Sequence, residues 1–166
     1  QSADRPIAIK MEGILMLSVG AEAPLFEAES TKGNVRLADY IGRQPIVLIF
    51  YPMDDTPGCT KQLCAVRDAK EDYDRFGALV IGVNAGSAEQ HLRFAGKHGF
   101  DFPIVADRDE SIRKAYDVGK LFGLIAQQRI VYVIDRSGRI AFAAKGNRPT
   151  EEILAVLERL QHEERH

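Results

Sequence analysis

The sequence is poor in cysteine and contains no tryptophan: its 166 residues include two cysteines and four histidines. An extracellular disulfide scaffold of this size would carry more cysteines, so we expect a reducing compartment. A zinc or iron–sulfur site built from cysteines would need ligands that the chain does not have. His91 and His98 lie seven residues apart, without the spacing of a metal-binding pair, so we expect no metal and no cofactor.

The chain also lacks a charge excess and a long hydrophobic run. Its 22 basic and 24 acidic residues give a formal net charge of −2, which argues against a nucleic-acid-binding surface. The longest apolar runs, 46–51 and 130–134, are much shorter than the roughly 20 residues needed to cross a bilayer. We therefore expect a soluble cytoplasmic protein with no nucleic-acid partner and no membrane partner.

The first residues stand apart because the sequence begins at Gln1 without an initiator methionine. We interpret residues 1–10 as a remnant of expression or of a removed targeting segment, and residues 11–166 as one domain. If a transit peptide preceded Gln1, we would expect the protein in an organelle instead.

Hydrophobic patterning predicts the architecture. Residues 45–50, 79–83 and 130–134 are almost wholly apolar, which is typical of strands buried on both faces of a sheet. Helical segments alternate with them, over 57–73, from the Ser87 capping box to Gly99, and from Thr150 onward. Turn residues predict hairpins around 32–34 and 136–138. The order indicates an α/β fold, a central mixed β-sheet flanked by helices, with an N-terminal β-hairpin.

The segment 51–60 is the one we expect to carry chemistry, because a strand there leaves the carboxyl edge of the sheet and turns into a helix. Thr56 is suited to the N-cap and Pro57 to the first helical position. Cys59 then occupies the third position, where free N–H groups and the helix dipole favour a thiolate and lower the pKa. The competing interpretation is an inert core cysteine, the commoner case for free thiols.

Asp54 and Asp55 oppose a thiolate, so the site needs a compensating cation. Lys61 is the nearest basic residue in the chain, although we expect its side chain to point into solvent. A cysteine hydrolase would require a histidine base beside the thiol, and nothing in the sequence places His91 or His98 there.

Cys64 follows Cys59 by five residues. On one helix such residues are roughly 8–9 Å apart between Cα atoms, whereas a disulfide needs less than about 7 Å. Three interpretations remain open: a small core residue, a static bridge in a segment that is not helical, or a resolving thiol reached when the helix unwinds.

The residues Pro52-x-x-x-Thr56-x-x-Cys59 resemble the active-site motif of peroxiredoxins. The longer string from Phe50 to Cys64, with Arg67-Asp68 after it, resembles the peroxiredoxin Q (bacterioferritin comigratory protein) subfamily. Segments 102–107 and 129–138 fit the same pattern, so the likeness runs from about Val19 to Leu160. It implies a thioredoxin-like fold and a thioredoxin-dependent thiol peroxidase that reduces hydrogen peroxide and small organic hydroperoxides.

The resemblance also implies a role for each matching residue. Cys59 would be the peroxidatic cysteine, and Cys64 the resolving cysteine of an intramolecular disulfide. Thr56 would hydrogen-bond the thiolate and the peroxide, and Pro52 would shield the site from water. Arg129 resembles the family's active-site arginine and would be the missing cation that counters Asp54 and Asp55. A thioredoxin-like protein would reduce the disulfide, and we expect a monomer, although dimers occur in the subfamily.

Two positions depart from the pattern. Residues 84–86 read Asn-Ala-Gly where many relatives carry Ser-x-Asp, and Val131 replaces a common threonine. We interpret both as variation near the pocket that bears on peroxide preference. Two rivals stay open: a one-Cys peroxidase resolved by an external thiol, and a redox-sensing or holdase-type binding module on the same fold.

Overall fold

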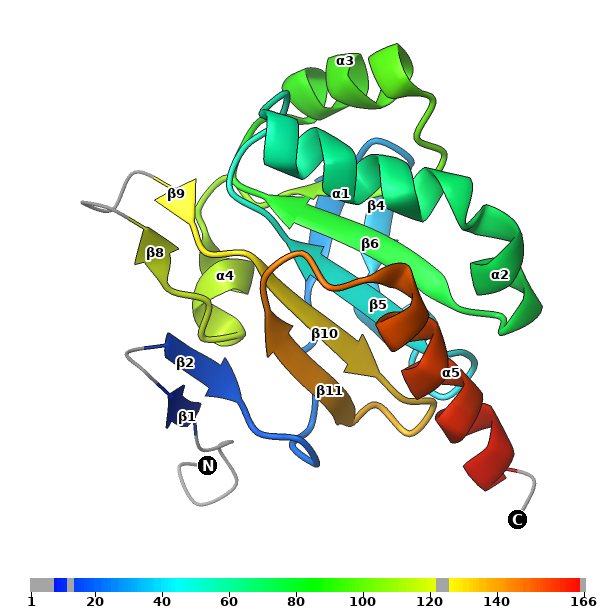
Figure 1. Cartoon of the computed structure of the whole chain (residues 1–166). Helices are drawn as coiled ribbons and strands as arrows, with labels where there is room; N and C mark the ends of the chain where they lie inside the picture. The colour runs from blue at the N-terminus through cyan, green and yellow to red at the C-terminus, as the bar shows by residue number, and fades with distance from the viewer. Residues whose placement is uncertain (1–7, 12–13, 122–125, 165–166) are drawn as a thin grey trace.

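The computed structural model describes residues 8–11, 14–121 and 126–164. A mixed sheet forms its centre, with the strand order β11-β10-β5-β6-β7-β3-β4 (Figure 1). The three inner strands β5, β6 and β7 run parallel, and the outer strands pair antiparallel. The strands are β3 (Glu27–Ser30), β4 (Gly33–Arg36), β5 (Ile46–Phe50), β6 (Leu79–Asn84), β7 (Ile104–Ala106), β10 (Ile130–Ile134) and β11 (Ile140–Lys145).

Helices cover both faces of this sheet, and α1, α2 and α5 lie over the face that Figure 1 turns to the viewer. Two further hairpins, β1–β2 and β8–β9, lie outside it. None of the helices in the described ranges is long and apolar enough to span a membrane. The helices are η2 (Leu37–Asp39), α1 (Pro57–Asp68), α2 (Lys70–Arg75), α3 (Ala88–His98), α4 (Ser111–Ala115) and α5 (Thr150–Glu164). The outlying strands are β1 (Ala8–Met11), β2 (Ile14–Leu17), β8 (Lys120–Leu121) and β9 (Ala126–Gln127).

Because successive side chains of a strand point to opposite faces, the sheet divides the interior into two apolar clusters. On one face, Val47 and Ile49 of β5 pack with side chains of α1, α2, α3 and α5. On the other face, Leu48 and Phe50 pack with α4 and β10, and with Leu17 of β2. Both faces of β5 are fully buried, which is why its sequence is apolar throughout.

Most of the predicted elements are confirmed. The three apolar runs are β5, β6 and β10, and the Ser87 capping box opens α3, which ends at Gly99 with a left-handed backbone. The hairpin at 136–138 joins β10 to β11. Gly138 is required there, because its φ is +89° and a Cβ would lie 2.8 Å from Ile41 Cγ2.

One expectation needs revision. The helix predicted over 57–73 breaks at Ala69, whose ψ of 16° ends α1 before α2 begins. No glycine or proline stands between Cys59 and Tyr73 to signal this break. Residues 8–10, which belong to the segment interpreted as a remnant, lie in β1, which pairs with β2 in an antiparallel hairpin. The origin of the segment and the domain boundary stay predictions.

Candidate active site

The loop from Tyr51 to Thr56 connects β5 to α1 at the carboxyl edge of the sheet, as the sequence predicted. Thr56 occupies the N-cap position and Pro57 the first helical position. The Thr56 hydroxyl, however, donates to the carbonyl of Met53 at 3.0 Å and does not cap a helical N–H group. Asp55 takes a left-handed backbone with φ of 61°, which turns the chain into the helix.

Cys59 lies at the third position of α1 and is fully buried. Its side chain belongs to the same apolar cluster as Tyr51 and Leu63. The first-turn N–H groups of a helix have no intrahelical acceptor and attract negative charge. The surroundings of Cys59 are therefore apolar on the core side and electropositive along the helix axis.

Arg129 lies beside the first two turns of α1. Its Nη1 donates to Oε1 of Gln62 at 2.7 Å, and its Nη2 lies 3.1 Å from the place that a Cβ on residue 58 would occupy. Gly58 therefore leaves room for the guanidinium next to Cys59. Gln62 was missed by the sequence reasoning, although its position one turn after Cys59 is a signal for a residue on this side of the helix.

The prediction that Arg129 counters the two aspartates is wrong, because both carboxylates turn to α3 instead. Asp54 Oδ2 lies 2.6 Å from Nδ1 of His91, and Asp55 Oδ1 lies 3.4 Å from Nζ of Lys97 and 3.8 Å from Nε2 of His98. This leaves the charge of Arg129 available beside the first turn of α1.

Tyr51 completes this arrangement from the end of β5. Its hydroxyl donates to Oδ1 of Asp54 at 2.6 Å. Burial, and after it the negative charge of Asp54, raises the pKa of Tyr51 well above its ordinary value. The phenol thus keeps its proton and remains a hydrogen-bond donor.

His91 and His98 both lie against the aspartates of the loop. His91 faces the Asp54 carboxylate with one ring nitrogen and the Asn84 carbonyl with the other, at 3.3 Å. Its ring is therefore not placed as the base of a cysteine hydrolase. Within the described ranges, no three His, Cys, Asp or Glu side chains are grouped so that they could hold a metal ion.

Cys64 is half-buried on α1, and both cysteines carry free thiols. The helix between them is continuous, so the interpretation of a static bridge in a non-helical segment is wrong. A bond between them requires α1 to change shape, because i and i+5 on a helix are too far apart. Lys61 is exposed, as expected.

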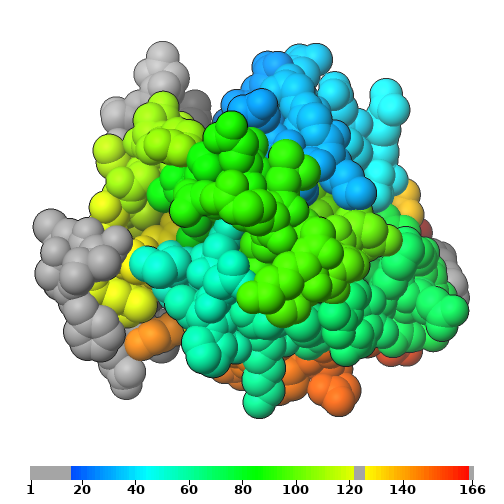
Figure 2. Space-filling model, turned by 90° about the horizontal axis from the view of Figure 1, so that it is seen from above, coloured from blue at the N-terminus to red at the C-terminus, as the bar shows by residue number. Residues whose placement is uncertain are grey.

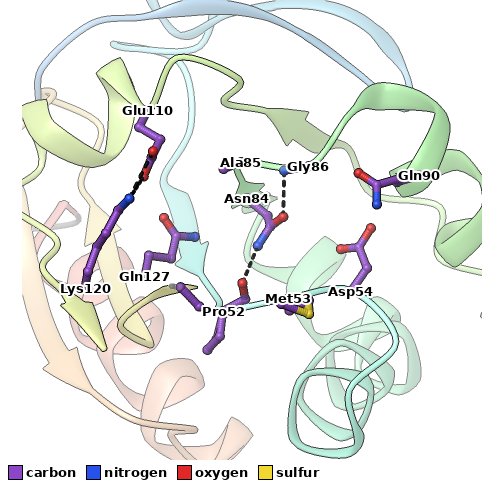
Figure 3. Close-up of a pocket in the computed structure, with 11 residues that line it drawn as sticks. Pro52, Met53, Asp54, Asn84, Ala85, Gly86, Gln90, Glu110, Lys120 and Gln127 are labelled. Carbon is purple, nitrogen blue, oxygen red and sulfur yellow. Dashed lines mark hydrogen bonds and ion pairs between the residues drawn. The ribbon is translucent and has the colours of Figure 1, made fainter. Parts of the chain in front are cut away.

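A cavity of about 400 Å³ opens on the Pro52 side of the loop (Figure 3). The Asn84 side-chain amide donates to the carbonyls of Tyr51 at 2.8 Å and Pro52 at 3.0 Å. The Gln127 amide donates to the carbonyls of Tyr51 and Val83, both at 2.8 Å. These two amides fix the carboxyl ends of β5 and β6 to one another.

The far wall of this cavity is charged, with Glu110 Oε1 and Lys120 Nζ at 2.9 Å. Residues 84–86 line this cavity, whereas Cys59, Thr56 and Arg129 are not among its lining residues. The expectation that residues 84–86 affect peroxide preference therefore stays a prediction. The lining residues are Pro52, Met53, Asp54, Asn84, Ala85, Gly86, Gln90, Glu110, Lys120, Ala126 and Gln127.

The chain has clear relatives among known proteins. A family model described as the AhpC/TSA family matches residues 19–143. The chain is 38% identical over 132 residues to Peroxiredoxin Bcp of Bacillus subtilis, an alignment that covers 76% of this chain and 83% of that protein. It is 37% identical over 145 residues to the chloroplastic Peroxiredoxin Q of Sedum lineare, covering 86% and 77%.

Solved structures are similar in the same way. Peroxidoxin BcpB of Mycobacterium tuberculosis has a TM-score of 0.78 at 27% identity, covering 86% of this chain and 97% of that one. Peroxiredoxin Q of Xanthomonas campestris has a TM-score of 0.72 at 29% identity, covering 82% and 90%. A reduced 2-Cys peroxiredoxin of Plasmodium vivax has a TM-score of 0.80 at 29% identity, covering 89% and 99%.

Proposed function

The chain belongs to the AhpC/TSA family as a peroxiredoxin of the Q/Bcp type, and on that premise we propose that Cys59 is the thiol that reacts with peroxide. The protein is a thiol peroxidase with the thioredoxin-like fold of this family. Its substrate is a peroxide, and its reductant is a thioredoxin-like protein. The observation that carries the assignment of Cys59 is its place in the first turn of α1, with the Arg129 guanidinium beside Gly58.

In the first step, the Cys59 thiolate attacks one peroxide oxygen, and the O–O bond breaks. The sulfur is oxidised to a sulfenic acid, and the other oxygen leaves as an alkoxide or hydroxide that takes up a proton. The Arg129 guanidinium would stabilise the negative charge that moves onto the leaving oxygen. Its orientation toward α1 by Gln62 supports this role.

Thr56 and Pro52 would complete the peroxide site. The Thr56 hydroxyl gives its proton to the Met53 carbonyl, so its oxygen is left as an acceptor for the hydrogen of a hydroperoxide. Pro52 has no N–H group, belongs to the loop itself and lines the cavity. These contacts support a site that binds the peroxide and keeps bulk water from the sulfenic acid.

In the second step, the Cys64 thiolate would attack the sulfur of the sulfenic acid. The S–S bond forms as the S–O bond breaks, and the hydroxide that leaves takes up a proton to become water. This forms an intramolecular Cys59–Cys64 disulfide, which a thioredoxin-like protein reduces. The step requires α1 to unwind, because the two thiols sit on one continuous helix.

The test is the intact mass of the reduced protein within seconds of adding one equivalent of hydrogen peroxide. We expect a loss of about two mass units, and its abolition in both Cys59→Ser and Cys64→Ser. A gain of about 16 or 32 would identify a one-Cys peroxidase with an external resolving thiol. An unchanged mass would contradict the assignment of Cys59.

We further propose that the protein is a monomer in the cytoplasm or in a chloroplast-type organelle. Its relatives include a bacterial protein and chloroplastic ones. Among the described residues, the large exposed apolar side chains come from separate segments: Val19, Leu25, Met53 and Leu92. A stable dimer interface is usually larger and more continuous. Light scattering on the reduced protein tests the oligomeric state.

A further inference from the structure

The strongest unexplained feature of the molecule is a buried acid–imidazole contact behind the active-site loop. The His91 side chain is fully buried, and the exposed fraction of the Asp54 side chain is 12%. Their closest atoms, Nδ1 and Oδ2, are 2.6 Å apart. Nothing in the peroxidase steps described above uses either group.

The hydrogen-bond partners determine where the protons are. The Asn84 carbonyl can only accept, so the hydrogen bond at Nε2 of His91 requires a proton on that nitrogen. Tyr51 donates to the other carboxylate oxygen, so both oxygens of Asp54 have a hydrogen-bond partner. Because an imidazole ordinarily binds a proton more tightly than a carboxylate, the proton between Nδ1 and Oδ2 belongs to His91. The contact is then a buried imidazolium–carboxylate pair.

The surroundings of His91 contain few other ionisable groups. The loop and β5 present Asp54 and, through it, Tyr51. The end of β6 presents the Asn84 carbonyl, and α1 contributes the Cys59 thiol to the same apolar cluster as Tyr51. Nearby on α3, Lys97 and His98 are directed to Asp55 instead.

The pair joins the segment that leads into α1 to the first turn of α3. The teal loop and the green helix α3 lie against one another on the surface in Figure 2. Asp55 and Lys97 make a second link between the same segments, but their side chains are 50% and 66% exposed. A third link runs from the far end of α1, where Arg67 Nη1 donates to the His98 carbonyl at 2.7 Å. Of the charged contacts between these segments, Asp54–His91 is the most shielded from water, because the Asp55 side chain that Lys97 and His98 contact is 50% exposed.

We propose that the Asp54–His91 pair is a positioning device that holds the loop before α1 and so sets how often α1 opens for Cys64 to reach Cys59. Removing one partner leaves the other charge buried and uncompensated, which releases the loop. A closed helix presents Cys59 to peroxide, whereas an open helix lets Cys64 approach. Weakening the pair therefore slows the first step and speeds the second. The proposal rests on the proposed function for the roles of the two thiols.

Two variants separate charge from hydrogen bonding. Asp54→Asn keeps every contact, since its amide oxygen accepts from Tyr51 and its amide nitrogen donates to a neutral His91 that still donates to Asn84. His91→Asn removes the cation and leaves the Asp54 carboxylate without its partner. Lys97→Gln is the matched control, because it removes the exposed pair between the same two segments.

The two steps are measured by rapid-quench mass spectrometry, with the first step isolated in a Cys64→Ser background. In His91→Asn we expect oxidation of Cys59 to slow about tenfold and disulfide formation to accelerate by a similar factor. Asp54→Asn changes each rate in the same direction by about threefold, and Lys97→Gln changes neither by more than about twofold. A general loss of structure would slow both steps together, and that outcome overturns the proposal.

Two measurements do not depend on which cysteine reacts. Nitrogen-15 spectra of the reduced protein are expected to show His91 with both ring nitrogens protonated, and with a single proton in Asp54→Asn. Hydrogen exchange of amides 60–65 is expected to be about tenfold faster in His91→Asn. A neutral His91 in the unaltered protein, or unchanged exchange, refutes the inference even if the disulfide forms. Faster exchange without a disulfide contradicts the proposed function of Cys64 and leaves the control of helix opening standing.

Discussion

The two faces of the central sheet use buried tyrosines in opposite ways. On the face covered by α1, the Tyr51 hydroxyl donates a hydrogen bond to the Asp54 carboxylate, which is itself in contact with His91. On the other face, the Tyr132 hydroxyl donates to the Tyr116 carbonyl at 2.7 Å and accepts from the Leu17 N–H group at 3.0 Å. Tyr116 in turn donates to the Pro24 carbonyl at 2.7 Å.

The difference distinguishes the region next to α1, which is proposed to open, from the region that holds distant chain segments together. The backbone-bound tyrosines tie together chain segments that are 92, 115 and 16 residues apart in sequence, with no charge involved. The contacts of Tyr51 and Asp54, by contrast, are concentrated in the loop before α1 and its neighbours. Substitutions on the first face are therefore expected to change rates, and those on the second to change stability.

The largest expected effect is on the α1 face. Replacing Arg129 by Gln removes the cationic side chain that is proposed to stabilise the leaving oxygen, so the second-order rate with hydrogen peroxide is expected to fall about 100-fold. The rate is measured by competition with catalase. Arg148→Gln, at an arginine paired with Glu152 of α5, is the control and keeps the rate. A loss smaller than threefold would mean that Arg129 does not act on the peroxide.

The opposite face is tested by Tyr132→Phe. This change leaves the Leu17 N–H group without its acceptor, so the free energy of unfolding is expected to fall by about 1–3 kcal/mol. The rate with peroxide should stay the same. Tyr40→Phe is the control, since within the described ranges the Tyr40 hydroxyl has no hydrogen bond. Urea unfolding measures the stability, and a slower peroxide reaction in Tyr132→Phe would show that the two faces are coupled.

A pair of glycine substitutions gives a smaller effect. Gly58→Ala places a Cβ 3.1 Å from Nη2 of Arg129, and moving the guanidinium by a few tenths of an ångström is expected to lower the rate about fivefold. Gly96→Ala on α3 meets nothing within 4 Å, so it should keep the rate and raise stability by about 0.5–1 kcal/mol through helix propensity. Equal rates in the two variants would mean that the position of Arg129 is not critical.

The smallest effect is a shift in titration. In Asp54→Asn the pKa of Tyr51 is expected to fall, because the second-largest cause of its elevation is removed, yet to stay above the ordinary value because burial is the largest. Ultraviolet difference titration measures it, with Tyr73, whose pKa burial raises to about 12, as the internal reference.

The same titration has a consequence for stability. Since Tyr73 ionises near pH 10 in the unfolded chain and at about 12 in the folded one, its contribution to stability is complete below pH 10. That contribution is lost as the pH rises from 10 through 12. Unfolding that is insensitive to pH in this window would contradict the burial of the phenol.

The sequence predicted the fold where local signals are strong. Unbroken apolar runs predict β5 and β10, and capping residues at both ends predict α3. It did not predict β7 or α4, which have three and five residues. Elements this short contain too few residues for a helical or strand periodicity to be recognised in the sequence. The sheet, not their own sequence, determines them.

The same distinction between local and distant signals applies to the residues of the candidate site. The place of Cys59 at a strand-to-helix junction follows from residues adjacent in the chain, whereas Arg129 could be connected to it only through the family resemblance. The Asp54–His91 contact joins residues 37 positions apart, and the Arg129–Gln62 contact joins residues 67 positions apart. A single sequence carries no information on such pairs, which is why the cation for Asp54 was misassigned.

The two amides at the strand ends have a consequence for the speed of the catalytic cycle. Asn84 and Gln127 hold the Tyr51 carbonyl from two sides, so the sheet edge stays fixed while α1 opens. Rewinding a short helix on a fixed template takes about 0.1–1 μs. Collisions with a reductant at about 10 μM succeed only about 1–100 times per second. The rate of turnover in the proposed cycle is then limited by the encounter with the reductant, because α1 refolds much faster than the reductant arrives.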